Sequence, residues 1–187
     1  MDAYEISYAL SHLTLLVDTR EQPTQRAKKR IESVGLPFER TTLSFGDYSA
    51  KISFSDGSTV SLDKVIAIER KMNLDELCAC FTHERKRFRA EFDRAKECGA
   101  KLYLLVENAD IEEAINGKYR SKMNPTAFVA SLFTWLARYN CQLIMCKEES
   151  SGRVIREILL RETKEYLEGV QDDDTKAKAK SKGNLLP

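Results

Sequence analysis

Long apolar segments are missing from this chain of 187 residues. No run approaches the roughly 20 apolar residues that a membrane-spanning helix requires. The first residues mix Asp2, Glu5 and His12 with apolar side chains, whereas a secretory signal has a basic segment followed by an apolar one. We therefore expect a protein that is neither membrane-bound nor secreted, and that works inside the cell, in the cytoplasm, nucleoid or nucleus.

Histidine is scarce, and the cysteines lack a pairing pattern. The five cysteines are an odd number without a Cys-x-x-Cys pair, and the two histidines, His12 and His83, lie far apart in the sequence. Cys78 and Cys80 do not have a zinc-ligand spacing, so we expect them to pack in the interior. These absences argue against a disulfide framework and a zinc site, and predict reduced thiols.

Net charge is nearly absent too, because 30 basic and 29 acidic side chains leave a formal charge of +1. Overall charge therefore gives no reason to expect nucleic-acid binding, and any such reason must come from local clusters. The share of hydrophobic residues, 42%, and of charged residues, 32%, is typical of a globular protein. The length suits one domain, and the sequence contains neither an internal repeat nor a long linker.

Strand and helix patterns alternate along the chain, which predicts an α/β fold. The expected strands cover residues 13–17, 38–43, 48–54, 59–62, 65–71, 101–107 and 141–146. The expected helices cover residues 22–34, 73–80, 82–97, 111–115, 125–139 and 150–167. Residues 1–12 are then an N-terminal extension and residues 13–170 the domain. From Asp172 onwards the composition narrows to Asp, Lys and Ala, so we expect a disordered tail over residues 171–187.

One strand ends in three consecutive charges, Glu69, Arg70 and Lys71. Because side chains alternate across a strand, Glu69 and Lys71 should project from one face and Arg70 from the other. Asp47 follows a glycine just before another strand, and Asp18 follows the first apolar run. Acidic residues at three strand ends or turns suggest a metal site. Taken alone, however, a strand that ends in Glu-Arg-Lys is usually a solvated strand end.

Three segments together resemble the nuclease domain of the XPF family of structure-specific endonucleases. They are Val17–Glu21, Leu43–Tyr48 and Ile68–Lys71, and Asp75 follows the last of them. That family's pattern is Gly-Asp, a variable gap, Glu-Arg-Lys, three residues and Asp, and it is complete here in the right order. The resemblance covers residues 13–167. It implies a restriction-endonuclease-like core, in which helices flank a central mixed β-sheet.

The resemblance also implies a divalent-metal-dependent endonuclease that hydrolyses branched, flap or fork DNA in repair, recombination or replication. The alternative is a catalytically inactive relative that binds DNA or acts as a scaffold. Retention of both carboxylates and the lysine favours the enzyme. Many members append a tandem helix-hairpin-helix module, which has no counterpart in this sequence, so an accessory DNA-binding partner is a further expectation.

Hard oxygen ligands are what phosphodiester hydrolysis with Mg²⁺ or Mn²⁺ requires. Asp47 and Glu69 are the expected ligands, and the backbone carbonyl of Ala67 or Ile68 could complete the set. Lys71 is placed to orient or deprotonate the attacking water and to offset the phosphate charge. Asp18 is either a further ligand or a support that holds the ligands in place.

Four other motif residues have both structural and functional interpretations. Arg20 and Glu21 either pair with each other, or Arg20 contacts the scissile phosphate. Arg70 faces away from Glu69, so a structural ion pair explains it at least as well as substrate contact. Asp75 lies in the first turn of a predicted helix, where an acidic residue suits the helix dipole whatever else it does. The resemblance implies that all four belong to the site.

Two basic segments follow the motif. Arg85, Arg89 and Lys96 fall near one face of a predicted helix, which indicates either a solvated face or contact with the DNA backbone. The second segment is a loop that contains Lys118 and Arg120, with a tyrosine between them that could stack on an unpaired base. We expect both segments to bind DNA.

The predicted helix at residues 125–139 is apolar over most of its surface. Its two neighbouring apolar stripes are Phe128, Leu132, Trp135 and Tyr139, and Val129, Phe133 and Leu136. Such a helix must be covered by its own domain, most simply by the helix at 151–167, or by another subunit. The resemblance favours a homodimer formed by these two helices, because XPF-family nuclease domains pair through their C-terminal helices.

Overall fold

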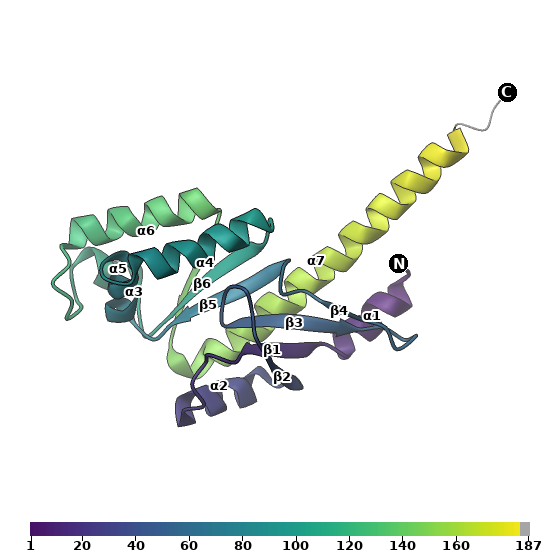
Figure 1. The fold of residues 1–187 in the computed structure, drawn as a ribbon. Helices are drawn as coiled ribbons and strands as arrows, with labels where there is room; N and C mark the ends of the chain where they lie inside the picture. The colour runs from purple at the N-terminus through teal and green to yellow at the C-terminus, as the bar shows by residue number, and fades with distance from the viewer. Residues whose placement is uncertain (184–187) are drawn as a thin grey trace.

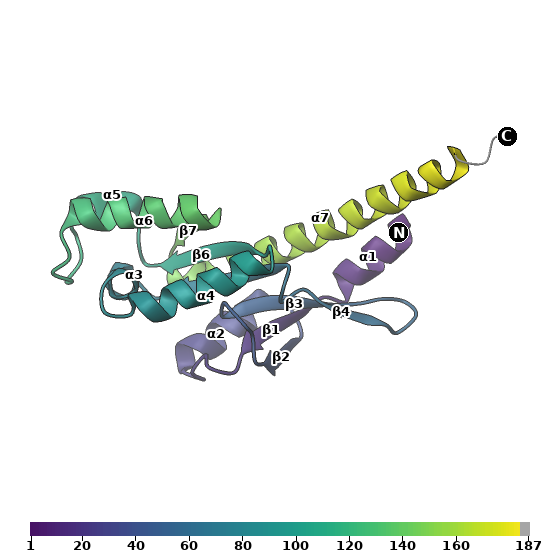
Figure 2. The same ribbon diagram turned by 45° about the horizontal axis from the view of Figure 1, so that its top comes forward.

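The computed structural model describes the backbone of residues 1–183 and the side chains of residues 1–169. A seven-stranded mixed sheet lies between two layers of helices, as Figures 1 and 2 show. The strands are β1 (Thr14–Asp18), β2 (Phe38–Thr41), β3 (Tyr48–Ser53), β4 (Thr59–Ser61), β5 (Ile66–Lys71), β6 (Lys101–Glu107) and β7 (Gln142–Cys146). The helices are α1 (Ala3–Ser11), α2 (Gln25–Val34), α3 (Leu74–Phe81), α4 (Arg85–Glu97), α5 (Ile111–Ile115), α6 (Pro125–Tyr139) and α7 (Glu148–Gly183). The predicted fold class is confirmed.

The strand order across the sheet is β2-β1-β3-β5-β6-β7, with β4 paired to β3. Strand β3 is antiparallel to both β1 and β5, whereas β5, β6 and β7 are parallel to one another. The carboxyl ends of β1, β5 and β6 therefore lie along the same edge of the sheet as the start of β3. Charged residues that are far apart in the sequence meet at this edge.

Side chains alternate across the central strands, so the sheet separates two hydrophobic cores. On β6, Leu102, Leu104 and Val106 pack with α3, α4 and α6, whereas Leu105 packs with α1, α2 and α7. A parallel strand that is covered on both faces has few polar positions, which explains the nearly continuous apolar run of β6.

Helix α6 is a core helix on one side. The apolar stripe from Phe128 to Tyr139 is buried against α3 and α4, where Trp135 stacks on Phe88 with ring centroids 5.1 Å apart. The expectation that the C-terminal helix covers α6 is wrong, because α7 packs with α2 on the opposite face of the sheet (Figure 1). On the outer stripe of α6, Phe133 remains 52% exposed.

The two ends of the chain are helical in the described structure. Within residues 1–12, the expected N-terminal extension, α1 packs against α7 and β3 and buries Ile6 in the core. The helix expected to end near Leu167 continues to Gly183, through most of the segment for which we predicted disorder. Ala and Lys are strong helix formers, so that composition also suits a continued helix. Residues 184–187 lie outside the described residues.

The other boundaries agree with the prediction within a few residues. Helix α2 begins at Gln25 because Thr24 accepts a hydrogen bond from the Ala27 N–H and so caps the helix. Gly35 ends that helix in a left-handed conformation, as predicted. None of the helices over residues 1–183 combines the length and the apolar character needed to cross a membrane.

Candidate functional site

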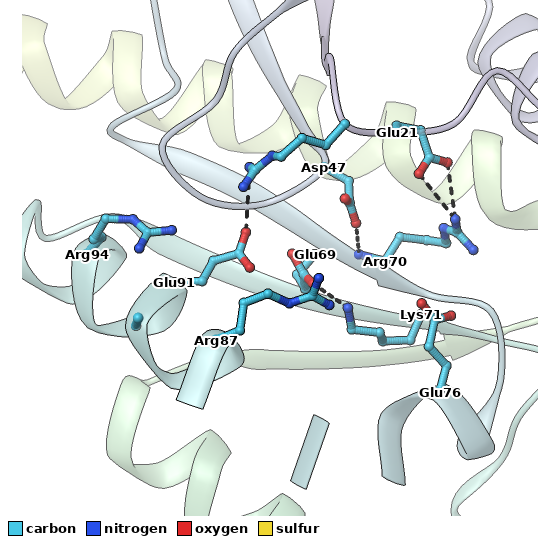
Figure 3. A pocket seen from close by; sticks show the side chains of 11 residues that line it. Glu21, Asp47, Glu69, Arg70, Lys71, Glu76, Arg87, Glu91 and Arg94 are labelled. Atoms are coloured by element: carbon cyan, nitrogen blue, oxygen red, sulfur yellow. Dashed lines mark hydrogen bonds and ion pairs between the residues drawn. The ribbon is translucent and has the colours of Figure 1, made fainter. Parts of the chain in front are cut away.

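A cavity of about 310 Å³ opens at the sheet edge where β5 ends and β3 begins, and helix α4 forms its outer wall (Figure 3). Its charged lining residues are Arg20, Glu21, Asp47, Glu69, Arg70, Lys71, Glu76, Arg87, Glu91 and Arg94. Six of the eight predicted motif residues line this cavity. The other two, Asp18 and Asp75, are not among the lining residues.

The turn that carries Asp47 is held from two sides. Gly46 has a φ of +73°, and a Cβ at this position would lie 2.9 Å from the Cβ of Ala67, so only glycine fits. The Gly46 N–H donates to Oε1 of Glu91 at 3.0 Å. The Arg70 N–H donates to Oδ2 of Asp47 at 2.8 Å, which fastens this carboxylate to β5.

Glu69 and Lys71 project from the same face of β5, as predicted, and Nζ of Lys71 lies 2.5 Å from Oε1 of Glu69. Burial raises the pKa of Asp47 to about 8, and repulsion by Glu69 adds to the rise. Burial also raises the pKa of Glu69, although the attraction of Lys71 opposes the rise. Burial alone would lower the pKa of Lys71, but Glu69 and Asp47 outweigh it and raise that pKa. The ammonium of Lys71 thus pairs with Glu69 and is also attracted by the charge of Asp47.

Asp18 lies behind the cavity and supports its wall. Its two carboxylate oxygens accept four hydrogen bonds, from N, Nε and Nη2 of Arg20 and from the Leu43 N–H. Burial alone would raise the pKa of Asp18, but these hydrogen bonds lower it. A carboxylate with every oxygen occupied is poorly suited to ligate a metal, so the geometry favours the supporting role over the ligand role.

Arg20 and Glu21 do not pair with each other, contrary to one of the two expectations. Arg20 pairs with Asp18, and its Nη2 lies 3.9 Å from Oε1 of Glu91 across the cavity mouth. Glu21 pairs instead with Arg30 and Arg70, each at 3.1 Å.

A buried ion network lies on the far side of β5 from Glu69. Oε1 and Oε2 of Glu107 accept from Nε and Nη2 of Arg30 at 2.6 and 3.0 Å. Arg30 also donates to the hydroxyl of Tyr48, which in turn donates to Glu21. Arg70 joins the network through Glu21, so its structural ion pair is present as expected. Arg30 and Glu107 could not be recognised from local sequence patterns, because their partners lie 9 to 77 residues away.

Comparison with known proteins identifies the family of this chain. The sequence model of the ERCC4 domain matches residues 17–158. The chain belongs to the ERCC4 domain family. Two solved structures are similar, both of XPF from Aeropyrum pernix, and the second is a complex with DNA.

The first structure has a TM-score of 0.55 and 21% sequence identity, and the match covers 79% of this chain and 60% of that chain. For the DNA complex the TM-score is 0.57 and the identity 20%, with 81% of this chain and 65% of that chain covered. The likeness therefore establishes the fold, and this ERCC4 domain spans about 60–65% of the XPF chains that it matches. The resemblance inferred from the sequence is confirmed. No curated protein matches the chain significantly.

The last acidic residue of the ERCC4 motif, Asp75, faces away from Glu69. It accepts hydrogen bonds from the backbone N–H groups of Arg120 and Ser121, at 2.7 and 2.8 Å. The proposed stacking residue, Tyr119, is half-buried: its ring centroid lies 5.2 Å from that of Phe128, and its hydroxyl donates to the Met123 carbonyl.

Helix α4 presents a different basic face to the site from the one predicted. Arg87 and Arg94 line the cavity together with Glu91, and their spacing of four and three residues places them on one side of the helix. Among the predicted residues, Lys96 donates to the Arg138 carbonyl on α6, and Arg89 pairs with an aspartate on its own helix. The helical spacing of Arg87, Glu91 and Arg94, directly after the motif, was the signal in the sequence that could have indicated this set.

The cavity offers oxygen atoms of the kind that bind a divalent cation. Among the described residues, no three His, Cys, Asp or Glu side chains are arranged as a metal cluster. Asp47 and Glu69 nevertheless supply two oxygen-ligand side chains, and of the two only Glu69 has an ion-pair partner among the described side chains, Lys71. The Ile68 carbonyl already accepts a hydrogen bond from the Asp47 N–H at 2.8 Å. This donor set fits Mg²⁺ or Mn²⁺, which take oxygen ligands and usually retain several waters.

Proposed function

We propose that this ERCC4 domain is a divalent-metal-dependent DNA endonuclease that hydrolyses phosphodiester bonds. The observation that carries the proposal is the pair of carboxylates, half-buried Asp47 and buried Glu69, that line a solvent-open cavity with the Lys71 ammonium. Asp47 has no ion-pair partner among residues 1–169, whereas Glu21 and Glu107 pair with arginines. Active sites are where such unbalanced groups are found.

Asp47 and Glu69 would hold Mg²⁺ or Mn²⁺, which when bound activates water and neutralises charge on the phosphate. The raised pKa of Lys71 keeps its ammonium protonated, so this residue orients water and stabilises the phosphate charge instead of accepting a proton. Arg20, Arg87 and Arg94 line the same cavity and would draw in and orient the phosphodiester.

The substrate in this proposal is branched, flap or fork DNA, met inside the cell during repair, recombination or replication. One of the two similar XPF structures is a complex with DNA, which supports DNA as the ligand class. The match covers only part of those XPF chains. Strand preference and the need for an accessory DNA-binding partner therefore have to be measured for this chain itself.

The test uses end-labelled duplex, fork and flap DNA, incubated with the purified protein in Mg²⁺, in Mn²⁺ and in EDTA. We expect cleavage in the first two conditions only, and greater cleavage of the branched substrates. DNA binding without cleavage in either metal would instead support the inactive, DNA-binding relative. The result with a linear duplex distinguishes structure-specific cleavage from general nuclease activity.

A homodimer is a second part of the proposal. The expected interface used both C-terminal helices, but α6 and α7 lie on opposite faces of the sheet, so we propose α6 alone as the interface. Phe133 on α6 is 52% exposed and Ile115 on the neighbouring α5 is 50% exposed, although both are large apolar residues. We expect light scattering at micromolar concentration to give twice the 21.4 kDa chain mass, and Phe133→Glu to reduce it to a monomer. Trp135 is unsuitable for this test because it is buried in the core. A wild-type mass near that of one chain, with and without DNA, would refute the dimer.

A further inference from the structure

A second hollow lies beside the site, on the other side of α3. Two adjoining cavities of about 440 and 530 Å³ share Thr82 and His83, at the turn between α3 and α4. We call the combined feature the basic groove. It is lined by the cations Arg85, Lys86, Arg89 and Arg120, which come from helix α4 and from the loop after α5.

Cations dominate the basic groove. Asp75 is the one carboxylate among its lining residues, and it pairs with Arg120 at 3.2 Å. Arg85 and Lys86 have no ion-pair partner among residues 1–169, and both side chains are exposed. The groove therefore carries unneutralised positive charge within reach of solvent, which the overall charge of +1 conceals.

The loop wall of the basic groove is fastened by Asp75. Its Oδ1 accepts the backbone N–H groups of Arg120 and Ser121, at 2.7 and 2.8 Å. Its Oδ2 accepts from Nε of Arg120 at 3.2 Å. Three donors thus hold the loop against the first turn of α3. The remaining nitrogens of Arg120 are free to face solvent, and its side chain is 88% exposed.

We infer that the basic groove binds the sugar–phosphate backbone of the DNA that flanks the scissile phosphate. Asp75 is then a positioning residue that holds the Arg120 loop as one wall of the groove. This inference rests on the proposed function, because it takes DNA as the ligand. It also assigns Asp75, the last residue of the motif, to substrate binding instead of metal binding.

The position of the groove relative to the site supports this assignment. Asp75 lines the groove, whereas the next residue, Glu76, lines the site cavity. The two hollows therefore meet at the first turn of α3. A DNA strand whose scissile phosphate lies in the site cavity could place neighbouring phosphates in the basic groove.

An acidic peptide is the competing ligand class. Peptide-binding grooves contain apolar pockets that anchor side chains, as well as charges. The side chains that line the basic groove are polar or basic except for Ala79. Such a lining offers phosphate contacts but no anchor for an apolar side chain, which favours DNA backbone.

The experiment measures binding of fluorescein-labelled fork DNA by anisotropy in EDTA, over a series of salt concentrations. The test variant is Arg85→Ala/Lys86→Ala/Arg120→Ala. The matched control, Lys28→Ala/Lys29→Ala/Arg153→Ala, removes the same charge from exposed positions on α2 and α7, across the sheet. Each lost phosphate contact flattens the slope of log affinity against log salt by about 0.9. We expect the test variant to lower the slope by about 2.7 and the affinity by on the order of 10²-fold at 0.1 M salt.

Two single variants test the role of Asp75. Asp75→Ala frees the loop and should weaken binding about as much as Arg120→Ala does, with little further loss when the two are combined. Asp75→Asn keeps an oxygen acceptor for the N–H groups of Arg120 and Ser121, so it should recover most of the affinity. If Asp75 instead acted through its negative charge on a metal, both replacements would impair it equally. Both would then lower kcat without changing DNA affinity.

The inference is overturned if the test variant and the control have the same salt slope, or if Asp75→Asn binds as weakly as Asp75→Ala. It is also overturned if the wild-type protein does not bind DNA, or binds a poly-glutamate peptide more tightly. Because binding is measured without metal, failure of the wild-type protein to cleave DNA in Mg²⁺ would refute the endonuclease proposal separately.

Discussion

Strand β5 separates two clusters of buried charge that differ in how fully each is neutralised. On one side Glu107 and Glu21 meet the two guanidinium groups of Arg30 and Arg70, and the charges balance. On the other side Glu69 pairs with the ammonium of Lys71, whereas Asp47 has no ion-pair partner among residues 1–169, and Glu91 adds to the repulsion on Glu69. Burial raises the pKa of both carboxylates on that side.

The two faces of this strand therefore differ in how completely their charges are paired. A balanced, hydrogen-bonded network adds little net stability, but removing one of its members is costly because a buried charge is left unpaired. The network also fixes the positions of its members. A carboxylate without an ion-pair partner, such as Asp47, is held in place by the surrounding fold, and our proposal is that it accepts a cation. The four predictions below test this contrast, from the largest expected effect to the smallest.

The largest effect should follow removal of the ligand charges. Asp47→Asn and Glu69→Gln should abolish Mg²⁺-dependent cleavage, and Lys71→Ala should lower its rate by about 10² to 10⁴. Cleavage of labelled fork DNA measures the rate, and circular dichroism checks the fold. Glu157→Gln, an exposed carboxylate on α7, is the matched control and should retain full activity. Undiminished cleavage by Asp47→Asn would remove the basis of the metal site.

Breaking the balanced network should affect stability most. Glu107→Gln or Arg30→Ala leaves a buried charge without its partner, which typically lowers the free energy of unfolding by about 3–5 kcal/mol. Urea denaturation measures the change. Arg161→Ala breaks an exposed pair with Glu157 and should change stability by less than about 1 kcal/mol. Equal effects of the buried and exposed replacements would show that the network has no special role.

The unbalanced cluster should make the metal-free protein less stable as pH rises. Below its ordinary pKa of 3.8, Asp47 is protonated in both states and does not oppose folding. Between that value and about 8, the folded state retains a proton that the unfolded state releases, so stability falls with increasing pH. Asp47→Asn removes this loss and should be more stable than wild type at pH 8 in EDTA, with a smaller difference at pH 5.

Thermal unfolding checks this prediction, because each 1 kcal/mol corresponds to about 2–4 °C for a chain of this size. Mg²⁺ at pH 8 should raise the melting temperature of wild type but not of Asp47→Asn. A pH dependence that is identical in the two proteins would contradict the assignment of the raised pKa to Asp47.

The smallest effect concerns the turn that carries Asp47. Gly46→Ala introduces a Cβ that meets Ala67 at 2.9 Å and also places alanine at positive φ, so we expect a loss of about 2–3 kcal/mol. Gly57→Ala has a comparable φ of +84° but nothing within 4 Å, so it should lose only about 1–2 kcal/mol. Similar losses in urea denaturation would mean that the backbone conformation, and not the close approach to β5, requires glycine at position 46.

Local patterns in the sequence determined the strand ends and the sides on which their charges project. Alternation along one strand was enough to place Glu69 and Lys71 together and Arg70 opposite them. The Gly-Asp pair before β3 was recognisable because a tight turn needs glycine and because the motif order is specific. These features depend on residues that are neighbours in the chain.

The tertiary structure alone decided which charges pair. Glu21 bonds with Arg70, 49 residues away, instead of with its neighbour Arg20, and Asp75 fastens a loop 45 residues further on. It also decided that α6 and α7 lie on opposite faces of the sheet. A charged side chain can pair with any opposite charge that the fold brings near, and ion pairing has no period along the chain from which that partner could be predicted.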